Sequence, residues 1–98
     1  MKGILIEPGR APEPASLPDT LSAMEVRLGG TVDNYIFSRT PAVLFFRNAG
    51  QPVNRVVRGA PLCGTILCYG WRNGDIRPLS GALLNEMLDR LKDTEVRV

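Results

Sequence analysis

Arginine is the residue type in this sequence that is best placed to do chemistry, and its distribution along the chain is uneven. Residues 34–85 contain one acidic residue, Asp75, and six basic residues, all of them arginine: Arg39, Arg47, Arg55, Arg58, Arg72 and Arg77. A guanidinium group is a planar fork of N–H donors that can grip a carboxylate or a phosphate at two points. The middle of the chain therefore favours binding of an anion, although a GC-rich genome would also enrich arginine.

The groups that most often perform catalysis are missing. The chain has no histidine, which is the commonest general base and the commonest metal ligand. The two cysteines have no histidine or carboxylate cluster near them in the sequence, so neither a zinc site nor a Cys–His nucleophile is predicted. No glycine-rich loop has the phosphate-binding spacing. We expect no enzymatic activity, no cofactor and no bound metal.

The candidate ligand-binding residues are arginines and aromatic residues close to predicted strand ends. Arginine would grip phosphates, and a tyrosine or tryptophan could stack on a base. The candidates are Arg47, Asn54, Arg55, Arg58, Tyr69, Trp71 and Arg72. Asn54 and Arg55 are expected to matter more to function than to folding. The alternative for this pair is structural: Asn54 closes a turn, and Arg55 donates hydrogen bonds to carbonyl groups at a strand end. The alternative for Trp71 is that its ring packs in the core or in an interface.

Five strands are predicted to position these residues. They cover Lys2 to Glu7, Thr31 to Phe37, Ala42 to Arg47, about Val53 to Val57, and Thr65 to Tyr69. Residues 8–18 contain four prolines and predict an extended connector. A hairpin loop is expected at residues 48–50, a break at residues 59–61, and a second hairpin turn at Asn73-Gly74. If the strands at 42–47 and 65–69 are neighbours, Arg47, Arg55 and Arg72 would meet at one sheet edge.

Two helices complete the predicted fold. The first has its N-cap at Asp19 or Thr20, ends at Gly29-Gly30, and carries an apolar stripe. The second runs from Ser80, its N-cap, to about Lys92, with Leu79 and Leu84 placed as a hydrophobic staple. The two stripes consist of Leu17, Leu21, Met24 and Leu28, and of Leu83, Leu84, Met87, Leu88 and Leu91.

These elements predict a single α+β domain over residues 1–98. We expect a small, mostly antiparallel or mixed sheet of about five strands with two helices on one face. The strands at 4–6, 43–46 and 66–69 are apolar without alternation, which is typical of a sheet covered on both faces. Two helices on one face leave the other face open, so a homodimer is expected to cover it; the alternative is a long loop of the same chain.

The cysteines and the apolar stretches favour a reducing, aqueous compartment. Cys63 and Cys68 are predicted to lie in one strand about 16 Å apart, too far for a disulfide. We expect them to be buried free thiols. No secretion signal and no membrane span is predicted, because the longest apolar run covers residues 42–46. The expected location is the cytoplasm.

Four short stretches carry a resemblance to a known family. They are Lys2-Gly3-Ile4-Leu5-Ile6-Glu7-Pro8-Gly9, Leu28-Gly29-Gly30, Pro52-Val53-Asn54-Arg55, and Cys63-Gly64-Thr65-Ile66-Leu67 leading to Gly70. Together they resemble an uncharacterised family of small proteins of phages, prophages and plasmid-bearing bacteria, domain of unknown function 3846. The acids expected in residues 56–62 are missing, and the acid-rich lead into the last helix is replaced by residues 71–77, whose one acid is Asp75. The resemblance implies a setting in mobile elements and in the conflict between phage and host, and the expected location is then the cytoplasm of the host cell if a phage encodes the protein.

These observations favour a binding protein over an enzyme. The expected function is to sequester an anionic, nucleotide-like ligand or to block a host protein, as anti-defence proteins do. The alternatives are an assembly partner that acts through protein contacts and a nucleic-acid-binding module. Nucleic acid is less favoured because the net charge is only +2 and no RNA-binding signature is present.

Overall fold

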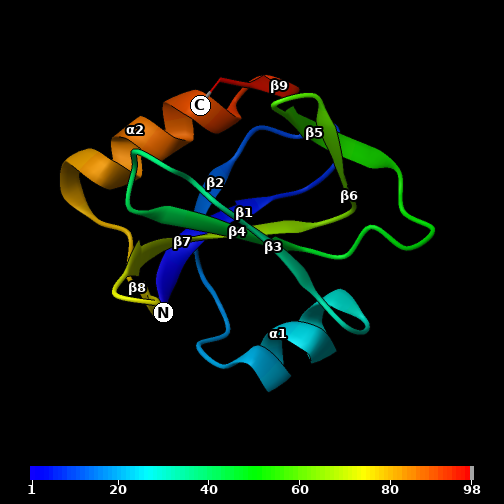
Figure 1. Ribbon diagram of the computed structural model, residues 1–98, viewed down its shortest axis with the longest axis horizontal. Helices are drawn as coiled ribbons and strands as arrows, with labels where there is room; N and C mark the ends of the chain where they lie inside the picture. The colour runs from blue at the N-terminus through cyan, green and yellow to red at the C-terminus, as the bar shows by residue number, and fades with distance from the viewer. Residues whose placement is uncertain (98) are drawn as a thin grey trace.

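The computed structural model describes residues 1–97 and contains two sheets and two helices (Figure 1). The larger sheet has the strand order β2-β1-β7-β4-β3, with β8 paired to β7, and all of its pairs are antiparallel. Its strands are β1 (Lys2–Ile6), β2 (Glu13–Ser16), β3 (Asp33–Ile36), β4 (Ala42–Phe46), β7 (Ile66–Arg72) and β8 (Asp75–Arg77).

The smaller sheet consists of β5 (Val53–Val57), β6 (Ala60–Cys63) and β9 (Glu95–Val96) in the order β6-β5-β9. The β5–β6 pair is antiparallel and the β5–β9 pair is parallel. The helices are α1 (Leu21–Leu28) and α2 (Gly81–Leu91). The α+β class and the mostly antiparallel sheet predicted from the sequence are confirmed.

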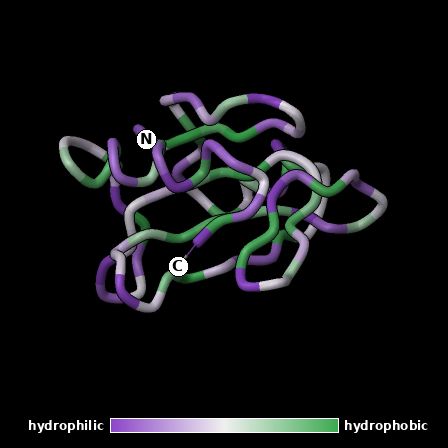
Figure 2. The backbone as a smooth tube through the Cα atoms, turned by 90° about the horizontal axis from the view of Figure 1, so that it is seen from above, coloured by the Kyte–Doolittle hydropathy of each residue, from purple (hydrophilic) through white to green (hydrophobic). Residues whose placement is uncertain are grey.

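The two helices cover opposite faces of the larger sheet, so the prediction that both lie on one face is wrong (Figure 1). Alternate residues of β4 show why. Leu44 and Phe46 pack with Met87 and Leu91 of α2, whereas Val43 and Phe45 pack in a second core with Met24 of α1. Figure 2 shows that hydrophobic and hydrophilic stretches alternate along the backbone.

This arrangement removes the argument for a dimer packed face to face. Val43, Leu67 and Tyr69 lie on the face expected to be open, and each is fully buried within a single chain. The segment leading to α1 contributes Leu17 to the same core. The chain itself covers the second face, but with α1 and the segment before it rather than with the long loop named as the alternative. A homo-oligomer stays a prediction.

The N-terminal third follows the predicted order with one correction. Residues 8–18 are not all connector, because residues 13–16 form the edge strand β2. An edge strand tolerates Pro14, since one side of the strand has no neighbour that needs its N–H. For α1, the Thr20 side chain accepts a hydrogen bond of 3.2 Å from the Ala23 N–H, and Gly29 ends the helix with a φ of +89°.

The middle third departs most from the prediction. The strand at 53–57 exists but does not form a hairpin with β4; β5 pairs with β6 and β9 in the smaller sheet. The predicted break at residues 59–61 is instead the two-residue turn Arg58-Gly59 followed by β6. Both sides of β4 are occupied by other strands: β3, which precedes it in the chain, and β7.

The C-terminal third agrees more closely with the sequence. Asn73-Gly74 forms the β7–β8 hairpin turn, and α2 buries Leu84, Met87 and Leu91. Ser80 occupies the N-cap position, but its side chain makes no capping hydrogen bond. No helix among residues 1–97 is long and apolar enough to cross a membrane.

The two cysteines lie in different strands, so the expectation that one strand carries both is wrong. Cys63 is in β6 and Cys68 is in β7, and both are free thiols. Cys68 is buried, and burial raises the pKa of its thiol. Cys63 is only partly buried, so the expectation of two buried thiols is correct for Cys68 alone. The predicted absence of a disulfide between them is confirmed.

Candidate functional site

The seven candidate residues predicted from the sequence do not form one site. Arg47 comes directly after β4, and Arg72 is the last residue of β7. The two strands are antiparallel neighbours, with Ala42 paired to Gly70 and Phe45 paired to Leu67. The C-terminal end of β4, next to Arg47, is therefore at the opposite end of the sheet from Arg72. The prediction that Arg47, Arg55 and Arg72 meet at one edge is wrong, because it required these strand ends to coincide and Arg55 to lie in the same sheet.

Asn54 and Arg55 are buried, each with 2% of its surface exposed. The Asn54 amide donates to the carbonyl oxygens of Ile6 at 2.9 Å and Gly64 at 2.7 Å. It therefore joins the end of β1 to the segment between β6 and β7. No part of this side chain faces solvent where a ligand would bind.

The Arg55 guanidinium is bound by oxygens of the protein itself. It donates to the Leu91 carbonyl at 2.7 Å, to the Arg10 carbonyl at 2.9 Å, and to the Asn54 carbonyl and side-chain oxygens at 3.0 and 2.7 Å. The Leu91 carbonyl is at the C-terminal end of α2, where a positive charge is favourable. Burial lowers the pKa of Arg55, and the negative charge of Asp93 opposes that shift. These contacts match the structural alternative for Arg55.

The aromatic candidates lie on the α1 side of the larger sheet. Tyr69 is fully buried, its ring contacts Phe45 edge to face at 5.6 Å, and its hydroxyl donates to the Pro18 carbonyl. Burial, with a smaller contribution from Asp19, raises the pKa of this phenol. Trp71 is half-buried against the same core. Both rings pack on the α1 side of the larger sheet, so neither can stack on a base bound on the α2 side.

The remaining candidate, Arg58, lies in a shallow hollow with two arginines that the sequence did not single out for the site. The hollow has a volume of ≈ 450 Å³ and is lined by Ser38, Arg39, Arg58, Glu95, Val96 and Arg97. We call it the basic hollow. Three arginines and one glutamate line it, and all four of these side chains are on exposed residues. Within residues 1–97, none of the three arginines forms an ion pair with a carboxylate.

Strand register explains why two of these arginines are neighbours. In the parallel pair β5–β9, Val56 lies opposite Glu95 and Val57 lies opposite Val96. Arg58 follows Val57 in the β5–β6 turn, Arg97 follows Val96, and both residues line the basic hollow. Like charges that share one hollow repel each other. Arg39 joins them from the connection between β3 and β4.

The backbone of Arg58 adds a second unfavourable feature. Its φ is +51°, in the left-handed region that glycine and asparagine tolerate best, and it begins the Arg58-Gly59 turn between β5 and β6. A bulky residue with positive φ invites a functional explanation. Here the turn holds the Arg58 side chain at the basic hollow.

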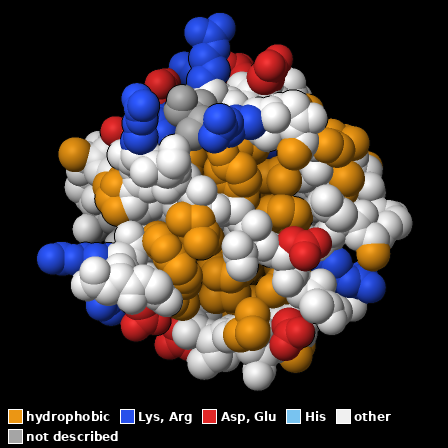
Figure 3. Space-filling view, in the orientation of Figure 1, with side chains coloured by type: hydrophobic (Ala, Val, Ile, Leu, Met, Phe, Trp, Pro, Cys, Tyr) orange, Lys and Arg blue, Asp and Glu red, His pale blue; other side chains and the backbone are white. Residues whose placement is uncertain are grey.

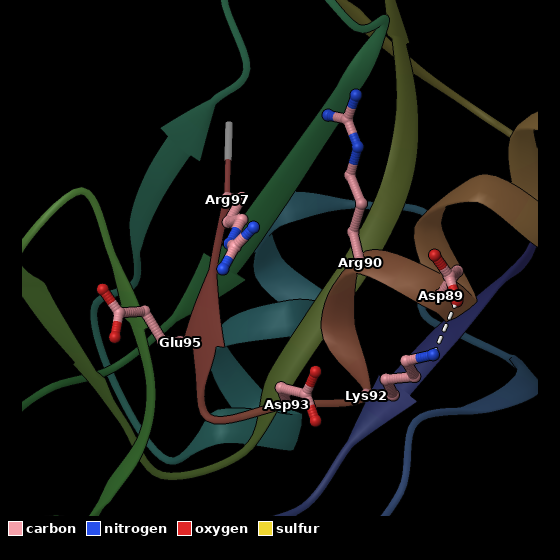
Figure 4. A pocket seen from close by; sticks show the side chains of 6 residues that line it. All are labelled: Asp89, Arg90, Lys92, Asp93, Glu95 and Arg97. Atoms are coloured by element: carbon pink, nitrogen blue, oxygen red, sulfur yellow. Dashed lines mark ion pairs between the residues drawn. The ribbon is translucent and has the colours of Figure 1, made fainter.

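A second hollow adjoins the basic hollow and has a different charge balance. It is lined by Asp89, Arg90, Lys92, Asp93, Glu95 and Arg97, three acids and three bases (Figure 4). Two of its three bases have carboxylate neighbours: Lys92 is 2.9 Å from Asp89, and Arg90 is 3.5 Å from Glu86. The third, Arg97, is shared with the basic hollow. The excess of positive charge therefore belongs to the basic hollow.

Residues Arg39, Arg97 and Glu95 were missed as site residues. Arg39 belonged to the arginine-rich segment but lay outside the predicted strand ends. Arg97 and Glu95 lay beyond the last predicted helix, and the two-residue strand β9 has no sequence periodicity. Gly59 directly after Arg58 was the available signal for the turn that carries Arg58, because glycine tolerates the positive φ that a two-residue hairpin turn requires.

These observations define the class: an α+β protein with an exposed, arginine-lined hollow. Among residues 1–97, no group of three or more cysteine, aspartate and glutamate side chains is placed to hold a metal ion. The chain belongs to the family of the Domain of unknown function (DUF3846), whose model matches residues 1–92. No curated protein and no solved structure matches the chain.

Proposed function

We propose that this protein is a non-catalytic binding protein that captures an anionic ligand in the basic hollow. The observation that carries the proposal is the presence of three arginines, Arg39, Arg58 and Arg97, in the lining of one hollow, where Arg58 and Arg97 directly follow the paired residues Val57 and Val96. Crowded like charges cost stability unless an anion compensates them. Glu95 supplies one negative charge in the lining, which leaves a net charge of +2 in the hollow.

The lining favours recognition of charged groups over recognition of a base. Guanidinium groups bind phosphate and carboxylate oxygens through paired, charge-assisted hydrogen bonds. No aromatic side chain lines the basic hollow, and the two aromatic candidates pack in the α1-side core. A phosphorylated molecule would therefore be held by its phosphates, with its base, if it has one, outside the hollow.

The acidic surface of a second protein is the other candidate ligand. The arginines are exposed and the hollow is open, which suits a carboxylate-rich surface as well as a small molecule. In the phage or mobile-element setting, the first activity would sequester a small anion and the second would block a host protein. Assembly of a larger complex and binding of nucleic acid remain the alternatives from the sequence.

Calorimetric titration with inorganic phosphate, pyrophosphate and ATP tests the proposal. The variants are Arg58→Asn, which keeps a residue suited to positive φ, and Arg97→Ala. Arg72→Ala is the matched control, since Arg72 is exposed, lies away from the basic hollow, and its loss removes the same charge. We expect each hollow variant to weaken pyrophosphate binding about tenfold, about 1.4 kcal/mol, and the control to leave it unchanged.

Two results would contradict the small-anion proposal. One is the absence of binding by all three anions. The other is an equal loss of affinity in Arg72→Ala, which would show attraction to overall charge rather than to a site. Binding of an acidic protein that Arg58→Asn weakens, without binding of small anions, would favour the second candidate.

A further inference from the structure

One arginine of the basic hollow belongs to a loop that the rest of the molecule must hold in place. Arg39 reaches the hollow from the connection between β3 and β4, residues 37–41, and not from a strand. An exposed arginine in a loop can adopt many conformations, and ordering it against a ligand costs free energy. Contacts that fix this loop before a ligand arrives therefore raise the affinity of the hollow.

Buried residues on both sides fix the part of the loop that carries Arg39. Phe37 is 4% exposed and packs in the core on the α2 side, and Thr40 is 7% exposed. The Phe37 N–H donates to the Ala42 carbonyl at 3.1 Å, and the Ala42 N–H donates to the Thr40 carbonyl at 2.7 Å. Arg39 is exposed and comes directly before Thr40. The place of Thr40 therefore sets where the Arg39 side chain begins.

The side chain of Thr40 is held by Arg90 of α2. The Arg90 Nη1 donates to the Thr40 hydroxyl oxygen at 2.9 Å, and its Nη2 lies 3.5 Å from a carboxylate oxygen of Glu86, one helical turn earlier. Figure 4 shows Arg90 extending away from Lys92 and Asp93. Among the side-chain hydrogen bonds within residues 1–97, this is the one that joins two side chains from distant parts of the chain. It ties the C-terminal half of α2 to the β3–β4 connection.

The surroundings of Arg90 place it next to the basic hollow but outside the lining. Arg90 lines the adjoining hollow and not the basic one. Figure 3 shows basic side chains gathered toward the top of the face in view, the part where Figure 1 places β9 and the C-terminal end of α2. An effect of Arg90 on a ligand in the basic hollow would therefore pass through the residues that it contacts.

We infer that Arg90 is a positioning residue for the basic hollow: through Thr40 it holds the β3–β4 connection so that Arg39 stays at the hollow. The inference rests on the proposed function, because it gives Arg90 a role in the affinity for the anion. The benefit is preorganisation, since a loop that is ordered before binding loses less conformational entropy when the ligand arrives.

Substitutions of Thr40 test this role without changing any charge. Thr40→Val removes the hydroxyl that accepts from Arg90 and keeps the branched shape of the side chain, so it should weaken pyrophosphate binding about fivefold. Thr40→Ser keeps the hydroxyl and should recover the wild-type affinity. Thr20→Val is the matched control, because it removes the hydroxyl that caps α1 and should leave the affinity unchanged. Calorimetric titration with pyrophosphate measures all three.

A double-mutant cycle shows whether the effect passes through Arg39. Thr40→Val should have no further effect on pyrophosphate binding in Arg39→Ala, because the side chain that it positions is then gone. Arg90→Lys keeps the positive charge but not the planar fork that contacts Thr40 and Glu86, so it should follow the same pattern as Thr40→Val.

The outcomes separate this inference from the proposed function. Wild-type affinity in Thr40→Val and Arg90→Lys would overturn the role of Arg90 and leave the proposed function standing. Equal losses with and without the Arg39 side chain would also overturn it, since the effect would not depend on Arg39. If the wild-type chain binds no anion, the proposed function fails, and the role of Arg90 fails with it.

Discussion

Two hairpins in this molecule use the same kind of two-residue turn with different residues. The β7–β8 turn contains Asn73 and Gly74, with φ values of +53° and +76°. The β5–β6 turn contains Arg58 and Gly59, with φ values of +51° and +80°. Positive φ at both positions favours Asn-Gly, the pair that the first turn has.

The difference separates a residue that suits its backbone from one that does not. Asn73 tolerates the left-handed region and needs no further explanation. Arg58 adopts the same conformation less favourably, and its side chain lies beside two other arginines. The turn itself would favour asparagine, so the presence of arginine is explained by the position of its side chain in the basic hollow. Arg55, three residues earlier, has the opposite character: it is buried and bonded to the protein's own oxygens.

The largest expected effect is the loss of stability on removing Arg55, which is a buried structural arginine and not an exposed one like Arg58. Arg55→Ala should lower the free energy of unfolding by about 3 kcal/mol, because it leaves buried carbonyl groups without donors. Chemical denaturation followed by circular dichroism measures the change. Arg97→Ala is the matched control and should stay within about 0.5 kcal/mol of wild type. A loss of stability in Arg55→Ala no larger than in Arg97→Ala would show that the Arg55 contacts contribute little.

A smaller effect is expected from exchanging the two turn residues. Arg58→Asn should raise the free energy of unfolding by about 1 kcal/mol, since asparagine tolerates positive φ and the charge beside Arg97 is removed. Asn73→Arg should lower it by a similar amount. Both are measured by denaturation in the absence of polyvalent anions. If Arg58→Asn destabilised the protein instead, Arg58 would be a stabilising turn residue and the comparison would fail.

Much of the fold was predictable where the signal is local. The helix α1 has a capping Thr20 and a terminal Gly29, and β7–β8 has Asn73-Gly74, so each element carries its own boundaries. The partners of β4 were not predictable in this way. They come from β3 and β7, and the apolar run of β4 fits any buried position in a sheet.

The candidate site was predictable only in part. An excess of arginine in residues 34–85 was visible, and Arg58 was among the candidates. Its neighbour Arg97 reaches the basic hollow through β9, a strand of two residues without its own periodicity. Asn54 and Arg55 look like exposed polar residues in the sequence. Their partners come from other parts of the chain: the Ile6 and Gly64 carbonyls for Asn54, and the Arg10 and Leu91 carbonyls for Arg55.

The most direct measurement is an NMR titration that follows the Nε–Hε signal of each arginine as pyrophosphate is added. We predict that the signals of Arg39, Arg58 and Arg97 shift together and saturate, whereas the signals of Arg55 and Arg72 stay in place. Hydrogen exchange at Arg55 Nε should also be slow, because this group is buried and donates to the Leu91 carbonyl. Equal shifts at Arg72, or a saturating shift at Arg55 without one at Arg58, would contradict the basic hollow as the binding site.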